Sequence, residues 1–200
     1  MVNEAAADRS GTRRRGAALV QAIHDATLAE LSGTGYARLS MEAVAARAGT
    51  GKAALYRRWP TKQDLVIDAL NATLPDLTRP IETAGTLRDS LLTCLRGMRD
   101  VLAGRTGFPD VTVLVELMRE PGVAQAYREK LITARMAILR SVLERAVERG
   151  ELRADKITPL VVRTGPALIL QGLLMTGTPP PDAELRRIVD EILLPLLGAG

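Results

Sequence analysis

The chain has 200 residues, a formal net charge of +4 at pH 7, 46% hydrophobic residues and 2% aromatic residues. This length suits one or two globular domains with an aliphatic core. The only cysteine, Cys94, excludes an internal disulfide and a cysteine-based zinc site, and the only histidine, His24, leaves catalytic triads poorly supplied. We therefore expect no metal, no cofactor and no enzymatic activity.

The excess positive charge lies in the first third of the chain. Residues 1–65 carry 10 Lys and Arg against 6 Asp and Glu, whereas residues 66–200 carry 17 of each. This asymmetry fits either a segment that faces nucleic acid or a solvated basic tail. The N-terminus lacks the apolar run of a signal peptide, and the most apolar stretch contains Arg163 and Pro166, so we expect a cytoplasmic protein without a membrane span.

Hydrophobic periodicity predicts helices along the whole chain and no strand. Polar residues 1–12 are expected to form a disordered basic tail. The helices are expected over residues 13–32, 41–48, 51–58, 62–74, 86–102, 111–119, 123–149, 158–175 and 183–194. A break between Pro75 and Pro80 separates residues 13–74, a helix-turn-helix domain with a connecting helix, from an all-helical domain of residues 81–197.

The segment LSMEAVAARAGTGKAALYRRWPTKQDL, residues 39–65, contains two short helices joined by a glycine turn. Small Ala45 and Ala48 allow these helices to approach closely, and Gly49 supplies the turn between them. Such a turn directs the second helix outward, where it can enter a DNA major groove. That helix begins with small residues beside one long cation, Lys52, which suits a surface lying close to bases.

This pattern resembles the N-terminal signature of the TetR family of transcriptional regulators. The resemblance covers residues 20–66, and further along it is limited to helical architecture and a loose run, LERAVERGELRAD. It is carried by Gly35-Tyr36, Ser40, Val44-Ala45, Ala48-Gly49, Leu55-Tyr56, Trp59, Lys62 and Leu65. In the family pattern Leu55 and Trp59 face the core of the domain.

The resemblance implies binding to double-stranded operator DNA. Ser40, Tyr56 and Lys62 would contact phosphates, and the first residues of the second short helix would face the bases. The expected DNA-contacting residues are Arg38, Ser40, Thr50, Gly51, Lys52, Ala53, Ala54, Tyr56, Arg57 and Lys62. Position 54 is often Thr or Ser in the family, and Ala54 cannot make that hydrogen bond. Tyr56 could also be a core aromatic residue, and Lys52 a solvated lysine.

The resemblance further implies an effector cavity and a homodimer in the C-terminal domain. The expected cavity residues are Cys94, Met98, Met118, Tyr127, Met136, Leu170 and Gln171. They would bind a small lipophilic effector, because methionines adapt to irregular ligands, although each methionine could also be plain core. The dimer is expected to form through the last two helices, at Leu168, Leu185, Ile188, Val189 and Ile192.

We thus expect an all-α protein with an N-terminal three-helix helix-turn-helix domain and a C-terminal helical ligand-binding and dimerisation domain. The function that follows is a ligand-responsive regulator, in the simplest case a repressor, which binds a palindromic operator as a homodimer and is released by a small apolar effector. Two alternatives stay open. One is a constitutive DNA-binding regulator without a ligand, and the other is a ligand-binding helical module with weakened DNA binding.

Overall fold

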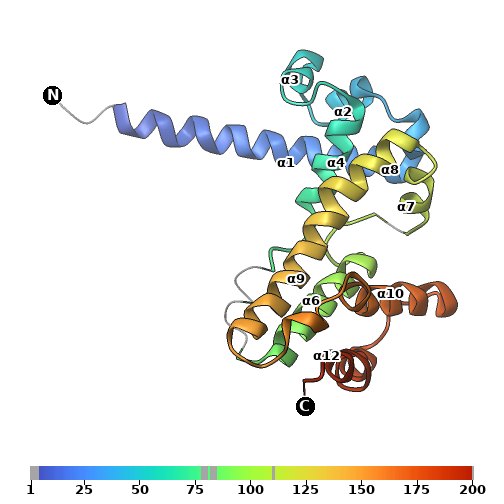
Figure 1. Ribbon diagram of the computed structural model, residues 1–200. Coiled ribbons are helices and arrows are strands. Elements are labelled where there is room, and N and C mark those ends of the chain that lie inside the picture. The colour runs from blue at the N-terminus through green and yellow to red at the C-terminus, as the bar shows by residue number, and fades with distance from the viewer. Residues whose placement is uncertain (1–4, 78–80, 82–84, 110, 200) are drawn as a thin grey trace. The chain divides into compact units, whose positions relative to one another are not determined.

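The computed structural model describes residues 5–77, 81, 85–109 and 111–199, with side chains from Gly16 onward. Every regular element in these ranges is helical, so the expected all-α class is confirmed (Figure 1). The elements are α1 (Ala5–Arg38), α2 (Met41–Arg47), α3 (Lys52–Tyr56), α4 (Lys62–Ala72), α6 (Leu87–Leu102), α7 (Val111–Leu117), α8 (Pro121–Tyr127), the π-helical η1 (Arg128–Ile132), α9 (Thr133–Glu148), the 3-10 turn η2 (Ala154–Lys156), α10 (Pro159–Thr176), α11 (Asp182–Arg187), the π-helical η3 (Ile188–Leu193) and α12 (Leu194–Leu197).

The chain divides into two compact units. The first comprises Met1–Thr73 and Pro109–Ala126, and the second comprises Leu74–Phe108 and Tyr127–Gly200. The break expected between Pro75 and Pro80 follows closely on Thr73, although Pro80 itself lies outside the described residues. Residues 109–126 were expected in the C-terminal domain. They group instead with the first unit, because α7 packs against α1.

The first unit is organised around the long helix α1, which packs against α2, α4 and α7. This helix begins at Ala5 rather than at the expected Arg13, because the alanine-rich run before Arg13 favours a helix and contains no proline. The structure therefore differs from the predicted tail over residues 5–12, while residues 1–4 lie outside the described part. Gly35, with φ of 76°, interrupts the helical backbone near its end.

His24 of α1 is buried in the core of the first unit. Its Nε2 atom lies 3.1 Å from Oδ2 of Asp68 on α4. The same carboxylate oxygen accepts a hydrogen bond of 2.8 Å from Nε1 of Trp59. The three side chains join α1, α4 and the residues that follow α3.

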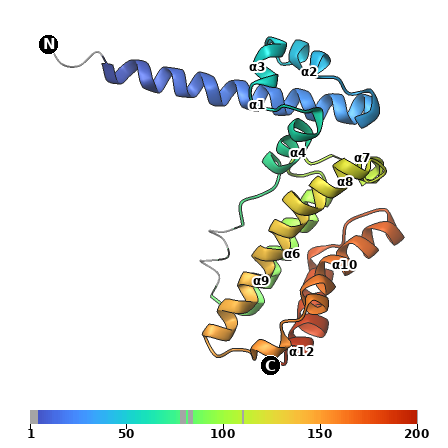
Figure 2. The same cartoon turned by 45° about the horizontal axis from the view of Figure 1, so that its top comes forward.

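The second unit is a helical bundle in which α6, α9 and α10 lie side by side (Figure 2), and η3 packs against α6 and α10. Its core is aliphatic, as the composition predicts. The fully buried members include Leu91, Leu95, Leu143, Ile169 and Leu185. The segments α11, η3 and α12 follow one another without a break, where one helix over residues 183–194 was expected.

Candidate functional site

The local backbone of the two short helices agrees with the sequence prediction. The Ser40 side chain caps α2 by accepting a hydrogen bond of 3.1 Å from the Ala43 amide, and Thr61 caps α4 in the same way through the Asp64 amide at 3.0 Å. Gly49, with φ of 65°, adopts the left-handed conformation between α2 and α3. The predicted glycine turn is therefore confirmed, and it sets the start of α3.

The side chains of α3 and the turn after it divide between core and surface. Leu55 and Trp59 are buried, in agreement with their predicted core positions. Tyr56 is 42% exposed, so it is not a core aromatic residue in this chain. Because Leu55 and Trp59 anchor the inner side of the segment, Tyr56 and Lys52 are left on its outer side.

All ten expected DNA-contacting residues are exposed or half-exposed. Lys52 forms an ion pair with Glu42 of α2, and its Nζ atom lies 5.5 Å from the centre of the Tyr56 ring. The hydrogen bond between them raises the pKa of Lys52 and lowers the pKa of Glu42. The sequence analysis missed Glu42, although a glutamate in the first turn of α2 beside a predicted base-reading lysine was the available signal.

Lys62 has a second function inside the first unit. Its Nζ atom donates a hydrogen bond of 2.9 Å to the Tyr36 carbonyl and lies 4.3 Å from the centre of the Tyr36 ring. This contact ties the start of α4 to the end of α1. An ammonium group has three N–H donors, so two remain for a phosphate.

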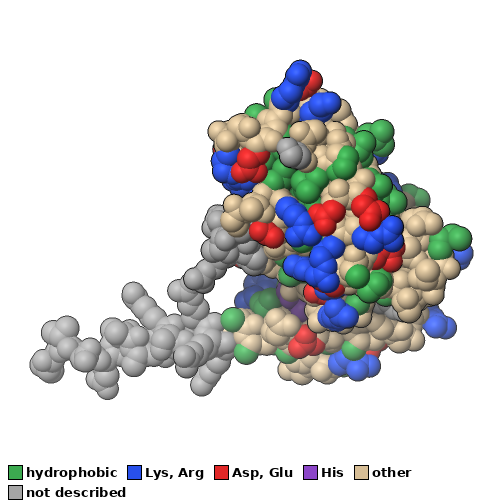
Figure 3. Space-filling view, turned by 90° about the horizontal axis from the view of Figure 1, so that it is seen from below, with side chains coloured by type: hydrophobic (Ala, Val, Ile, Leu, Met, Phe, Trp, Pro, Cys, Tyr) green, Lys and Arg blue, Asp and Glu red, His purple; other side chains and the backbone are tan. Residues whose placement is uncertain are grey.

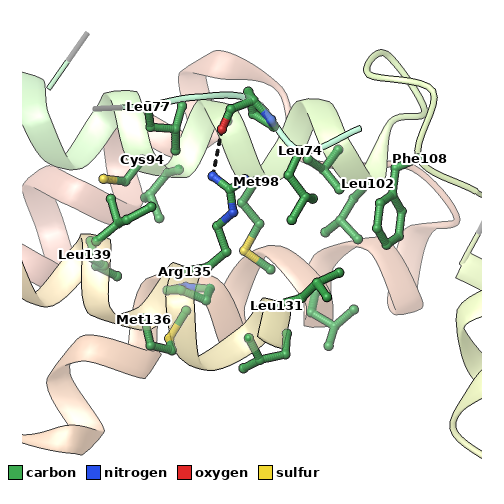
Figure 4. A pocket seen from close by; sticks show the side chains of 18 of the residues that line it. Leu74, Leu77, Cys94, Met98, Leu102, Phe108, Leu131, Arg135, Met136 and Leu139 are labelled. Atoms are coloured by element: carbon green, nitrogen blue, oxygen red, sulfur yellow. Dashed lines mark hydrogen bonds between the residues drawn. The ribbon is translucent and has the colours of Figure 1, made fainter. Parts of the chain in front are cut away.

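The second unit contains a cavity of about 350 Å³ that is lined mainly by apolar side chains (Figure 4). Five of the seven expected residues line it: Cys94, Met98, Tyr127, Met136 and Leu170. Sequence reasoning missed the aliphatic and aromatic residues Leu74, Leu77, Leu102, Phe108, Leu131 and Leu139, and also the arginines Arg135 and Arg163. The cavity is therefore largely apolar, with two cationic groups in its lining.

Two expected cavity residues lie elsewhere. Met118 follows α7 and belongs to the other compact unit. Gln171 is exposed on α10, because one residue along a helix turns a side chain by about 100° away from its neighbour Leu170. These two assignments were wrong for a shared reason: helical periodicity identifies a face but does not say what that face packs against.

The polar groups contributed to the cavity by Cys94 and Tyr127 are neutral at physiological pH. Burial raises the pKa of the Cys94 thiol to about 11, with Arg145 opposing the shift. Burial alone raises the pKa of the Tyr127 hydroxyl to about 12. Tyr127 directly precedes the π-helical turn η1, whose Leu131 and Ile132 also line the cavity. Such π-helical turns often occur where a helix is adapted to a functional site.

The expected dimer residues are mostly not on the surface. Leu185, Ile188 and Val189 are buried in the core of their own chain, Leu168 is half-buried, and Ile192 is 39% exposed. The prediction failed because an apolar stripe satisfies an internal core as well as an interface. The largest exposed apolar side chains of α10 are different residues, namely Leu160, Leu174 and Met175.

Helix α10 is long and apolar enough by length and composition to cross a membrane, yet only 22% of it is buried within the chain. It also contains Arg163 and Pro166, and one such helix is a weak indication of a membrane span. Exposed apolar side chains such as those of α10 are typical of a helix that packs against another protein chain.

Two short helices joined by a tight glycine turn, with the outer side of the second helix exposed and cationic, define a helix-turn-helix DNA-binding protein. The family model for bacterial regulatory proteins of the TetR family matches residues 23–69, and the model for a tetracyclin-repressor-like C-terminal domain matches residues 81–192. The chain belongs to the TetR family. It is therefore a DNA-binding transcriptional regulator and not an enzyme.

Similar proteins agree with this placement. The uncharacterized HTH-type transcriptional regulator Rv1556 of Mycobacterium tuberculosis is 32% identical, with 86% of this chain and 84% of that protein covered. The DNA-binding transcriptional repressor TetR of Mycobacteroides abscessus is also 32% identical, and the match covers 83% of this chain and 87% of that protein. The regulator FadR of Bacillus subtilis, solved in complex with stearoyl-CoA, has the same fold: the TM-score is 0.66 at 18% identity, with 90% and 98% covered.

Proposed function

We propose that the protein is a cytoplasmic, ligand-responsive repressor that binds a palindromic operator as a homodimer and leaves it when a small effector binds. The observation that carries this proposal is an outward-facing α3 that begins with Lys52 and is followed by Arg57 and Arg58, in a chain that also contains a cavity of about 350 Å³. A volume in this range is typical of small-molecule sites. The repressor of Mycobacteroides abscessus supports repression as the direction of regulation.

The homodimer is supported by the exposed apolar surface of the last helices. Leu160 and Leu174 are 69% and 66% exposed and lie fourteen positions apart on α10, close to one face of the helix. Leu196 of α12 adds a further exposed apolar side chain. Pairing α10 and the α11–α12 segment with their symmetry mates would make a four-helix interface of the isologous type. Two recognition helices would then read two half-sites.

The proposal is tested by coupling two measurements. Apolar compounds are first screened for an increase in melting temperature, and the hits are then tested for release of a labelled DNA fragment from the region upstream of the gene. An effector that binds the DNA-free state more tightly should raise the melting temperature and weaken DNA binding, by no more than its differential affinity for the two states. Hits that stabilise the protein and leave its DNA affinity unchanged would contradict induction by ligand.

A further inference from the structure

The cavity of the second unit contains a charge that its apolar lining does not neutralise. The Arg135 side chain extends from α9 into the cavity among leucines and methionines (Figure 4). Its Nη1 atom donates a hydrogen bond of 2.7 Å to the Pro75 carbonyl. A guanidinium has five N–H donors, so this neutral acceptor satisfies only a small part of its bonding capacity.

Arg135 differs in this respect from other arginines of the same unit. Figure 3 shows cationic and anionic side chains intermixed on one face of the molecule, and several of the unit's arginines pair with carboxylates. Arg88 binds Asp190 at 2.6 Å, and Arg140 binds Glu144 at 2.7 Å. Within the part of the chain that the structure describes, no carboxylate forms an ion pair with Arg135.

The Arg135 side chain is partly buried. Burial lowers the pKa of its guanidinium, and the negative charge of Asp76 opposes that shift. A guanidinium remains charged even so, because its ordinary pKa lies above about 12. A second arginine of the lining, Arg163, is exposed to solvent, and it donates its Nε–H to the Pro159 carbonyl at 3.1 Å.

We propose that the effector is an anionic amphiphile, in which a carboxylate pairs with Arg135 and an aliphatic chain fills the apolar lining. This inference rests on the proposed ligand-binding function. A half-buried cation is costly unless it is paired, and a carboxylate can accept two parallel hydrogen bonds from one guanidinium. A neutral lipophile would leave Arg135 without an anionic partner, and a cationic lipophile would be repelled by it.

The cavity has the size of a small-molecule site, so the probe we choose is a medium-chain carboxylate. Decanoate is such a compound. Decanol and decylamine have nearly the same size and chain and differ in the charge of the head group, so the three compounds separate charge recognition from hydrophobic burial.

The test is calorimetric titration of the full chain with decanoate, decanol and decylamine, each below its micelle-forming concentration. We expect decanoate to bind at least tenfold more tightly than decanol, which corresponds to about 1.4 kcal/mol. Decylamine should bind most weakly. The preference for decanoate should decrease as salt is added. Equal affinity for decanoate and decanol would overturn the proposal.

The variant Arg135→Met removes the charge and keeps an apolar side chain of similar length. We expect it to bind decanoate and decanol equally, while Arg140→Met, a change at an exposed arginine on the same helix, keeps the wild-type preference. Arg135→Lys retains a charge without the planar fork and should keep part of the preference, which provides a second test if Arg135→Met is unstable. An Arg135→Met protein that folds and still prefers decanoate would overturn the assignment to Arg135.

Failure of this inference is distinguishable from failure of the proposed function. If a neutral lipophile releases operator DNA and decanoate does not bind, the repressor proposal stands and the anionic effector is wrong. If decanoate binds in an Arg135-dependent manner and leaves DNA affinity unchanged, the ligand class is correct and the induction mechanism is wrong. The same DNA fragment and ligand stocks serve both measurements.

Discussion

Lys52 pairs with Glu42 in the free protein and is expected to contact a base when DNA is bound. In the free protein it pairs with Glu42 and lies near the Tyr56 ring, and these contacts hold it on the outer side of α3. The pair is exposed, so it contributes little to folding stability and can open when DNA approaches. A lysine at this position can then donate to guanine O6 and N7 in the major groove.

We expect Lys52→Ala to lose roughly 1–3 kcal/mol of discrimination between operator variants while losing less affinity for random DNA. Arg57→Ala is the matched comparison, because Arg57 is exposed on the same segment and is expected to contact phosphate. Arg57→Ala should weaken binding to all DNA sequences alike, and it should reduce the slope of log affinity against log salt concentration by about one. Fluorescence anisotropy on cognate and random duplexes measures both effects. Equal losses of Lys52→Ala on the two duplexes would make Lys52 a phosphate contact.

At the scale of elements, the carboxylate of Asp68 joins three parts of the first unit. It accepts a hydrogen bond from Trp59 and lies within bonding distance of buried His24. Removing the acceptor leaves donors of these side chains without a partner, which typically costs on the order of 1–3 kcal/mol. Because Asp68 positions Trp59 at the end of the recognition segment, it links the stability of α1 and α4 to the placement of α3.

We therefore expect Asp68→Ala to lower the free energy of unfolding by about 1–3 kcal/mol. Trp59 is the only tryptophan, so its fluorescence follows unfolding in urea directly. The control is Asp25→Ala, since Asp25 is an exposed aspartate on α1 that is bonded by Gln21 at 2.9 Å. Loss of stability no greater than in this control would show that the Asp68 contacts are not structural.

Asp182 ties the start of α11 to α6 and makes that contact sensitive to acid. The hydrogen bonds from Arg96 lower the pKa of Asp182 to about 2. In the unfolded chain the pKa of an aspartate is about 3.9. Because the folded-state pKa of Asp182 is lower, its ion pair stabilises the fold at pH values above about 4, and this contribution is lost as the pH falls toward 2. We expect Asp182→Asn to be less stable than the wild type at pH 7, and the difference to shrink below about pH 4. A pH-independent difference in urea midpoint would contradict this assignment.

The sequence predicted local features well and long-range partners poorly. The turn at Gly49 depends on neighbours within a few residues, so the local pattern alone identified it, and the family pattern identified the inner position of Leu55. Leu185 and Val189 were assigned to an interface, because an apolar stripe looks the same whether its own core or a second chain covers it. Arg135 was not predicted as a cavity residue, because a lone arginine on an amphipathic helix is ordinarily solvated.

The whole molecule is expected to function as a dimer. We expect the double change Leu160→Glu and Leu174→Glu to yield monomers with intact helix content, because like charges would meet across the α10 surface. Val115→Glu serves as the control, since Val115 is 53% exposed and lies in α7, which belongs to the first unit. Sedimentation velocity distinguishes the species. A dimer that survives the double change would place the interface elsewhere.

The proposed dimer and the proposed effector site together imply a mechanism for regulation. In such a dimer two recognition helices would meet two half-sites at once, so an effector that favours a different arrangement of the subunits would weaken both contacts together. Moving a population from 1:99 to 99:1 requires roughly 5.5 kcal/mol of differential binding. An effector with a small preference between the states would therefore give only partial release.

The most direct test of sequence-specific recognition by a dimer is selection of randomised DNA duplexes by the purified wild-type protein. We expect the enriched pool to converge on an inverted repeat whose half-sites lie about one helical turn or more apart. Lys52→Ala should relax the base preference within each half-site. Enrichment of a single half-site would contradict the dimer, and a pool that shows no enrichment would contradict sequence-specific DNA recognition itself.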